Sequence, residues 1–101
     1  MRVISMGRLR AFWQAGHRDA ERPLRDWYRR ARAADWSSIA DVRRMFPHAD
    51  AVETDAGTLT VFNIAGNKYR LITRIRYEWR LVNVRGVLTH DAYDKGQWKE
   101  A

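Results

Sequence analysis

The spacing of apolar residues changes near Pro47, and this change constrains the fold more than any other feature of the sequence. Before Pro47, apolar residues recur three or four positions apart, which is typical of amphipathic helices. From residue 58 to residue 88, apolar and polar residues alternate, which is the period of β-strands. Helices first and strands last predict the α+β fold class, with the helices packed on one face of an antiparallel sheet.

Three helices are expected before Pro47, after a short opening strand at residues 2–5. Each helix is preceded by a residue whose side chain could accept a hydrogen bond from the first turn, namely Ser5, Asp19 and Ser37. The second helix has one apolar face, which predicts a core contact, and an opposite face of arginines that predicts exposure to solvent. The arginines of that exposed face are Arg22, Arg25, Arg29 and Arg32.

Three strands are expected at residues 58–64, 68–77 and 80–88, joined by turns at 65–67 and around Glu78. In the middle strand one face should join the core, and the other should be open and basic. The predicted core face carries Tyr69, Leu71, Thr73, Ile75 and Tyr77, and the open face carries Lys68, Arg70, Ile72, Arg74 and Arg76. In the last strand the alternation predicts one apolar set at Val82, Val84, Gly86 and Leu88, with Arg85 on the other side.

The chain has 101 residues and a formal net charge of +7, which predicts one domain, residues 1–101, with a polyanionic partner such as nucleic acid, a ribosome or an acidic protein. It has no cysteine, which excludes disulfides and thiolate metal sites. It also has no apolar run long enough for a signal peptide or a membrane helix. We therefore expect a cytoplasmic protein without a membrane partner.

Polar residues that could carry chemistry gather at the ends of the predicted strands. They are Asn63, Asn67, His90 and Tyr93, beside the cations of the open face. RNA cleavage by its own 2′-hydroxyl needs a base, cations for the phosphorane and an acid for the leaving oxygen. A histidine can move a proton near neutral pH, and a tyrosine beside several cations is expected to have its ionised form favoured. The three histidines are far apart in sequence, so no metal site and no cofactor are expected.

The same residues also fit roles without catalysis. The open face of any antiparallel sheet must be polar, and long cations there also deter aggregation between sheet edges. The cations would equally suit a non-catalytic RNA-binding or ribosome-binding module. Trp79 and Trp98 could stack on bases, although packing accounts for them as well.

Two motifs resemble the HigB group of RelE-like toxins of bacterial toxin–antitoxin systems. One is the run VFNIAGNKYRLI at residues 61–72, and the other is VLTHDAYD at residues 87–94. The resemblance implies a RelE-like fold with helices over a curved antiparallel sheet. It also implies an mRNA endoribonuclease that acts in the A site of translating ribosomes without a metal. The implied partner is a helix-turn-helix antitoxin of the HigA type, through which alone the toxin would reach operator DNA.

The resemblance also implies roles for individual residues. Arg70 would stabilise the phosphate in the transition state, and His90 and Tyr93 would share proton transfer or base stacking. The remaining catalytic candidate is Lys68, and the candidates for binding RNA or phosphate are Asn63, Asn67, Arg74, Arg76 and Arg85. The resemblance leaves open an inactive toxin that is retained as a co-repressor of its operon.

Overall fold

The computed structural model describes residues 1–100, and for Glu100 it describes the backbone alone. These described residues form five strands, four α-helices and three short 3₁₀ helices. In order they are β1 (Arg2–Ile4), α1 (Gly7–Gln14), η1 (Arg18–Ala20), α2 (Glu21–Ala33), α3 (Ile39–Met45), β2 (Asp50–Thr54), β3 (Gly57–Ile64), β4 (Tyr69–Arg76), η2 (Tyr77–Trp79), β5 (Leu81–Thr89), α4 (His90–Asp94) and η3 (Gln97–Glu100).

The five strands form one sheet in the order β1-β5-β4-β3-β2. The strands from β2 to β5 pair antiparallel, as expected, whereas β1 pairs parallel to β5 at the edge. The parallel pairing is possible because the helices and the other strands form a long crossover between these two strands. The α+β prediction is confirmed, with a sheet that is mixed and includes β2, which the residue pattern did not predict.

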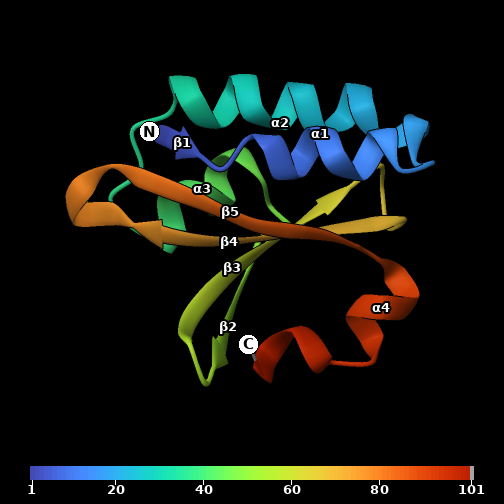
Figure 1. Ribbon diagram of the computed structural model, residues 1–101. Helices are drawn as coiled ribbons and strands as arrows, with labels where there is room; N and C mark the ends of the chain where they lie inside the picture. The colour runs from blue at the N-terminus through green and yellow to red at the C-terminus, as the bar shows by residue number, and fades with distance from the viewer. Residues whose placement is uncertain (101) are drawn as a thin grey trace.

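The helices α1, α2 and α3 cover one face of the sheet and bury the main core (Figure 1). Trp27 of α2 meets Phe62 of β3 edge to face, with ring centroids 5.4 Å apart, and Trp36 stacks on the same Phe62 at 6.2 Å. Trp27 and Phe62 are each 1% exposed. The apolar face predicted for the second helix therefore packs against the predicted strands, and this aromatic contact joins the two halves of the chain.

A β-bulge at Arg85 corrects the predicted faces of the last strand. Ile72 pairs with Gly86, but the next residue, Thr73, pairs with Val84, so Arg85 is the extra residue. The extra residue reverses the alternation beyond it. As a result Val87 joins the main core, while Gly86 and Leu88 lie on the face of Ile72, which makes the predicted set wrong at both positions.

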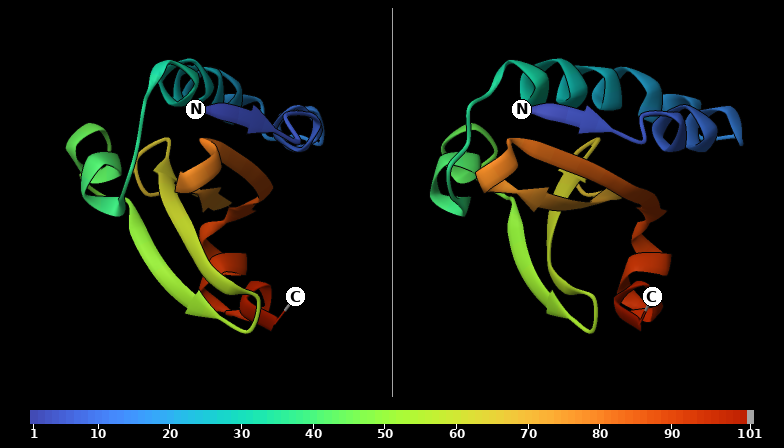
Figure 2. Two further views of the ribbon diagram at one scale, coloured as in Figure 1. Left: turned by 90° about the vertical axis from the view of Figure 1, so that its left-hand side faces the viewer. Right: turned by 60° about the vertical axis from the view of Figure 1, so that its left-hand side comes forward.

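The other face of the sheet holds a smaller apolar cluster of Leu59, Val61 and Ile72. Tyr93 and Trp98, from the C-terminal segment of α4 and η3, pack against it. Figure 2 shows that this segment lies across the sheet from α1 and α2. The expectation of an open face is therefore wrong where this segment covers the sheet.

The three predicted capping side chains have other partners. Ser5 has a positive φ of 66° and bonds Asn83 through its hydroxyl at 3.2 Å. Asp19 accepts hydrogen bonds from Lys68 and Tyr69, and the N-cap of α2 is Ala20. Ser37 donates its backbone N–H (2.9 Å) and its hydroxyl (3.1 Å) to the carboxylate of Asp41 in α3. The cap predictions were wrong, since the N-caps are Met6, Ala20 and Ser38. Ser5 and Asp19 have partners far away in the sequence, and Ser37 donates to Asp41 instead of accepting from the helix backbone.

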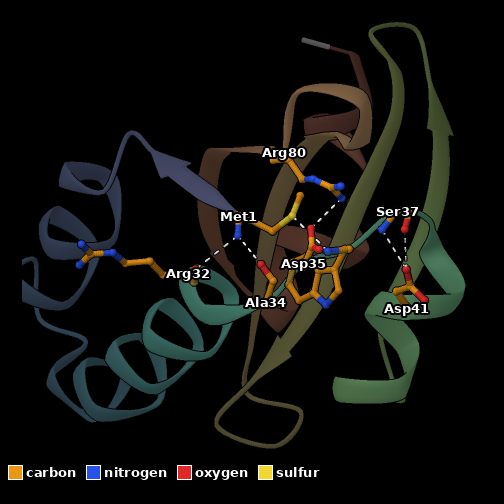
Figure 3. Close-up of polar contacts among 8 residues, drawn as sticks. Met1, Arg32, Ala34, Asp35, Ser37, Asp41 and Arg80 are labelled. Atoms are coloured by element: carbon orange, nitrogen blue, oxygen red, sulfur yellow. Dashed lines mark hydrogen bonds and ion pairs between the residues drawn. The ribbon is translucent and has the colours of Figure 1, made fainter.

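Met1, the residue before β1, forms hydrogen bonds with the end of α2 (Figure 3). The Met1 ammonium donates to the carbonyl oxygens of Arg32, at 3.3 Å, and of Ala34. These carbonyls lie at the C-terminal end of α2, where a positive charge is favourable. Asp35 forms an ion pair with Arg80 at 2.7 Å, which connects the same corner to the start of β5.

No helix in the described part of the chain combines the length and the apolar character needed to cross a membrane.

Candidate functional site

Six of the predicted site residues meet at one end of the sheet. Asn63 of β3 pairs with Arg70 of β4, and the backbone N–H of His90 donates to the Lys68 carbonyl at 3.2 Å. The group consists of Asn63, Asn67, Lys68, Arg70, His90 and Tyr93. We call these six residues the strand-end cluster. They come together because the β3–β4 turn and the end of β5 lie beside each other.

Arg70 is held in place by backbone and aromatic contacts. Its Nη1 donates to the carbonyl oxygens of Asn67, at 3.0 Å, and Tyr69, at 3.2 Å. Its Cζ lies 5.4 Å from the centroid of the Tyr93 ring, which is cation–π distance. Among the described residues, its Nε and Nη2 donors have no hydrogen-bond partner. The guanidinium is therefore preorganised and keeps donors for an anion.

Tyr93 lies between Arg70 and Trp98. Its ring stacks on Trp98 at 5.0 Å, and the Trp98 indole N–H donates to the Tyr93 carbonyl at 3.0 Å. Burial raises the pKa of Tyr93, and the carboxylates of Asp50 and Asp94 raise this pKa further, against the opposing effect of Arg70. The expectation that nearby cations favour the ionised form was wrong, because burial outweighs Arg70. At neutral pH Tyr93 is a phenol, which can donate a proton.

His90 begins α4, directly after β5. Thr89 caps this helix by accepting from the Ala92 backbone N–H at 3.2 Å, so the local sequence turns the chain at His90. His90 Nδ1 lies 3.0 Å from Asp94 Oδ2, one helical turn later. The nearby carboxylate favours the tautomer that carries its proton on Nδ1, which leaves Nε2 as the nitrogen that can accept a proton.

Lys68 belongs to the strand-end cluster through its backbone, but its side chain is engaged with Asp19. The ammonium contacts the Asp19 carboxylate, and Tyr69 donates its hydroxyl hydrogen to the same carboxylate at 2.7 Å. The hydrogen bond with Asp19 raises the pKa of Lys68, and the bonds from Lys68 and Tyr69 lower the pKa of Asp19. Lys68 is therefore a cation that is already paired with a carboxylate.

The two asparagines lie at the β3–β4 turn. Asn63 Nδ2 donates to Asn67 Oδ1 at 3.4 Å, and the Asn67 carbonyl accepts from Arg70. The turn residues Ala65 and Gly66 have positive φ values of 54° and 68°, and this left-handed backbone reverses the chain between β3 and β4. In the free protein the asparagines therefore shape the turn that holds Arg70.

The other three predicted arginines lie elsewhere on the sheet. Arg74 lies near the β2–β3 turn, with its guanidinium next to Gly57. A side chain at Gly57 would place its Cβ 3.3 Å from Arg74 Nη2. The Arg76 guanidinium lies 5.3 Å from the ring centroid of the exposed Trp79. Arg85 is the bulge residue and lines a groove beside Trp98. The structure does not place these three in contact with the strand-end cluster.

Two supporting residues of this site were not found as such from the sequence. Asp19 is 49 residues from Lys68, so no local pattern could connect them. Trp98 was considered for packing or base stacking, but its contact with Tyr93 depends on the path of the chain after α4. Asp94 had a usable signal, since it follows His90 by one helical turn.

No group of three histidine, aspartate or glutamate side chains within the described residues is placed to hold a metal ion. The described cluster offers instead a fixed guanidinium, a phenol, and an imidazole oriented by a carboxylate. These groups can bind a phosphate and move protons on and off its oxygens.

Comparison with known proteins identifies the family of this chain. A search among curated proteins found no match. The model of the HigB toxin family, described as the RelE-like toxic component of a toxin–antitoxin system, matches residues 20–96. The matched segment runs from the start of α2 to just beyond α4 and contains the whole strand-end cluster. The chain therefore belongs to the HigB family of RelE-like toxins.

Proposed function

We propose that this toxin is an endoribonuclease that cuts mRNA on the translating ribosome, with the strand-end cluster as its active site. The observation that carries the proposal is the arrangement around Arg70: the guanidinium is held over Tyr93 and keeps donors for a phosphate. His90, oriented by Asp94, lies at the end of the neighbouring strand. Family membership supports the toxin role, and this geometry supports phosphate chemistry.

The proposed reaction uses the 2′-hydroxyl of the RNA as the nucleophile. His90 Nε2 accepts the proton of this hydroxyl while the 2′-oxygen forms a bond to the adjacent phosphorus. The bond between phosphorus and the 5′-oxygen breaks, and Tyr93 donates its proton to that oxygen. The products are a 2′,3′-cyclic phosphate and a 5′-hydroxyl, and proton exchange with water restores both side chains. The step needs only these side chains and the RNA, so we propose that it is independent of metal and cofactor.

Arg70 stabilises the transition state in this proposal. The phosphorane carries an extra negative charge, and the two-pronged guanidinium can donate to two of its oxygens. Because the backbone and Tyr93 already hold Arg70, little reorganisation is needed when the charge develops. Lys68, Asn63 and Asn67 would position the RNA backbone beside it, and Arg74, Arg76 and Arg85 would bind phosphates further along the sheet.

The basic surface supports docking on the ribosome. The net charge is +7, and α2 exposes Arg22, Arg25, Arg29 and Arg32. Of these, Arg25 pairs with Glu21 and Arg29 with Asp26 on the same helix, so part of the charge is already compensated. We further propose that the chain acts in the cytoplasm on mRNA in the A site. Its antitoxin would be of the HigA helix-turn-helix type, and the toxin would reach operator DNA through that antitoxin.

The test is mRNA cleavage by the wild type, Arg70→Gln and the control Arg10→Gln, which removes an exposed arginine of α1. After induction in a bacterial host, primer extension on an abundant message should show breaks within the translated region for the wild type and the control. Arg70→Gln should lose them at equal protein level. RNA binding without breaks would indicate a non-catalytic module, and absence of both would indicate an inactive copy; either result contradicts the proposal.

A further inference from the structure

A groove of about 450 Å³ lies beside the strand-end cluster. The start of α1, the strand β5 and the C-terminal segment form its walls. The residues that matter for its chemistry are Arg8, Ile72, Asn83, Arg85, Leu88 and Trp98. The proposed reaction itself assigns no role to this groove.

The floor of the groove is apolar. Ile72 belongs to the smaller cluster on this sheet face, and Leu88 and Trp98 are half-buried against that cluster. Two aliphatic side chains beside an indole ring form a surface that suits the flat face of a nucleobase. The polar Asn83 side chain at the wall offers a donor and an acceptor for a base edge.

Two arginines make the groove positive. Arg8 Nη1 donates to the backbone carbonyl of Arg85 at 2.9 Å, so the β-bulge brings both arginines to one groove. Neither forms an ion pair with a carboxylate whose side chain the structure describes. The Lys99 ammonium lies nearby, 5.6 Å from the Trp98 ring centroid. Unpaired cations above an apolar floor are complementary to a nucleotide.

The groove is continuous with the strand-end cluster. Leu88 on its floor pairs directly with Arg70 in the β4–β5 ladder, and Trp98 stacks against Tyr93. Ile72 follows Arg70 by two residues on the same face, which is about 7 Å along a strand. An extended chain whose phosphate lies at Arg70 therefore reaches the groove with its neighbouring residue.

We propose that this groove binds the RNA nucleotide adjacent to the one cut at Arg70. The base lies against Ile72, Leu88 and Trp98, and its phosphate is bound by Arg8 and Arg85. This inference rests on the proposed function, because it takes single-stranded RNA as the substrate. Arg8 and Trp98 lie outside residues 20–96, so family membership does not imply the groove. An acidic segment of the antitoxin is the competing occupant, and continuity with Arg70 favours the nucleotide.

The test compares how tightly the wild type and three variants bind an RNA that cannot be cut. The probe is a fluorescein-labelled six-nucleotide RNA carrying 2′-O-methyl groups throughout, and the readout is fluorescence anisotropy at several salt concentrations. Arg8→Gln and Arg85→Gln should each weaken binding by about 5- to 20-fold and lower the salt slope by about 0.7, as expected for one lost phosphate contact to a single strand. Arg10→Gln, two residues from Arg8 in the same helix, should stay within about twofold of the wild type.

Three results would overturn the groove assignment. In one, Arg8→Gln and Arg85→Gln bind as Arg10→Gln does; in another, the wild type binds with a Kd above about 1 mM. In the third, the Trp98 indole and Gly86 amide NMR signals shift with the antitoxin but not with the RNA. Arg85 contributes only its carbonyl to the bond with Arg8, so Arg85→Gln keeps that contact. Failure of cleavage itself would appear separately, as a wild type that binds the probe but makes no breaks.

Discussion

Tyr69 of the sheet donates a 2.7 Å hydrogen bond to Asp19, a residue 50 positions earlier in the helical half of the chain. The same carboxylate pairs with Lys68. This contact connects η1 to the strand that carries Arg70. The position of this strand relative to the helices thus depends in part on one exposed carboxylate.

We expect Asp19→Asn to destabilise the protein in a manner that depends on pH. The folded state lowers the pKa of Asp19 below the usual value of 3.8, so the ionised form stabilises the fold above that pH. This contribution is lost as the pH falls through the folded-state pKa. Urea unfolding should therefore separate the two proteins at pH 7, with the gap in stability closing as the pH falls below the usual pKa of 3.8. A gap that is constant over this range would contradict the assigned ion pair.

Tyr93→Phe should lower the rate of RNA cleavage by about 10²-fold or more, because it removes the proton donor. The ring remains, so the contacts with Arg70 and Trp98 persist and the urea midpoint should change little. The raised pKa of Tyr93 keeps its proton in place throughout pH 6–9, so this group should not limit the wild-type rate there. Single-turnover cleavage of a ribosome-bound message measures the effect, and an unchanged rate would remove Tyr93 from the mechanism.

Asp94→Asn should lower kcat by about 10- to 100-fold with little change in KM, because the imidazole of His90 loses the carboxylate that orients it. In the proposed mechanism Asp94 acts through His90 as a positioning residue. Asp91→Asn is the matched control, since Asp91 is on the same helix and pairs with no described side chain. Equal kcat values for the two variants would show that the contact between His90 and Asp94 has no functional role.

Ala65→Gly should stabilise the protein by about 1 kcal/mol, because a non-glycine residue in the left-handed region carries a cost of that order. Ala65 has φ of 54° in the β3–β4 turn. Ala40→Gly, at an exposed position in α3, should have the opposite sign and destabilise by about 1 kcal/mol. Denaturant midpoints measure both, and a destabilised Ala65→Gly would mean that the turn does not have this conformation in solution.

The sequence was sufficient to predict the fold class, the three large helices and the three long strands. Periodicity sufficed because Trp27 and Phe62 follow the regular spacing of their elements and meet in the main core. It failed at β2, whose residues 50–54 carry a single apolar residue of strand type, Val52, at an exposed edge. Periodicity also failed at Arg85, because one extra residue in a strand does not change the composition of that strand.

The sequence predicted which residues form the candidate site better than it predicted their protonation and their side-chain partners. Antiparallel pairing places Asn63 beside Arg70, and the end of β5 brings the backbone of His90 to Lys68. The protonation of Tyr93 was not predictable, because it depends on how far Tyr93 is buried where the C-terminal segment packs on the sheet, and on Asp50 of β2. The pairing of Lys68 with Asp19 depends on helix placement, which no local pattern encodes.

The C-terminal segment packs on the smaller apolar cluster through Tyr93 and Trp98, which stack on each other. Local fraying of this segment would therefore expose Leu59, Val61 and Ile72 and remove the support of Arg70 in one event, while the core beneath the helices stayed intact. We expect proteolytic cleavage between α4 and Trp98 to abolish the activity of the toxin without unfolding it. We therefore expect activity and global stability to be separable in this small domain, because the proposed active site and the main core lie on opposite faces of one sheet.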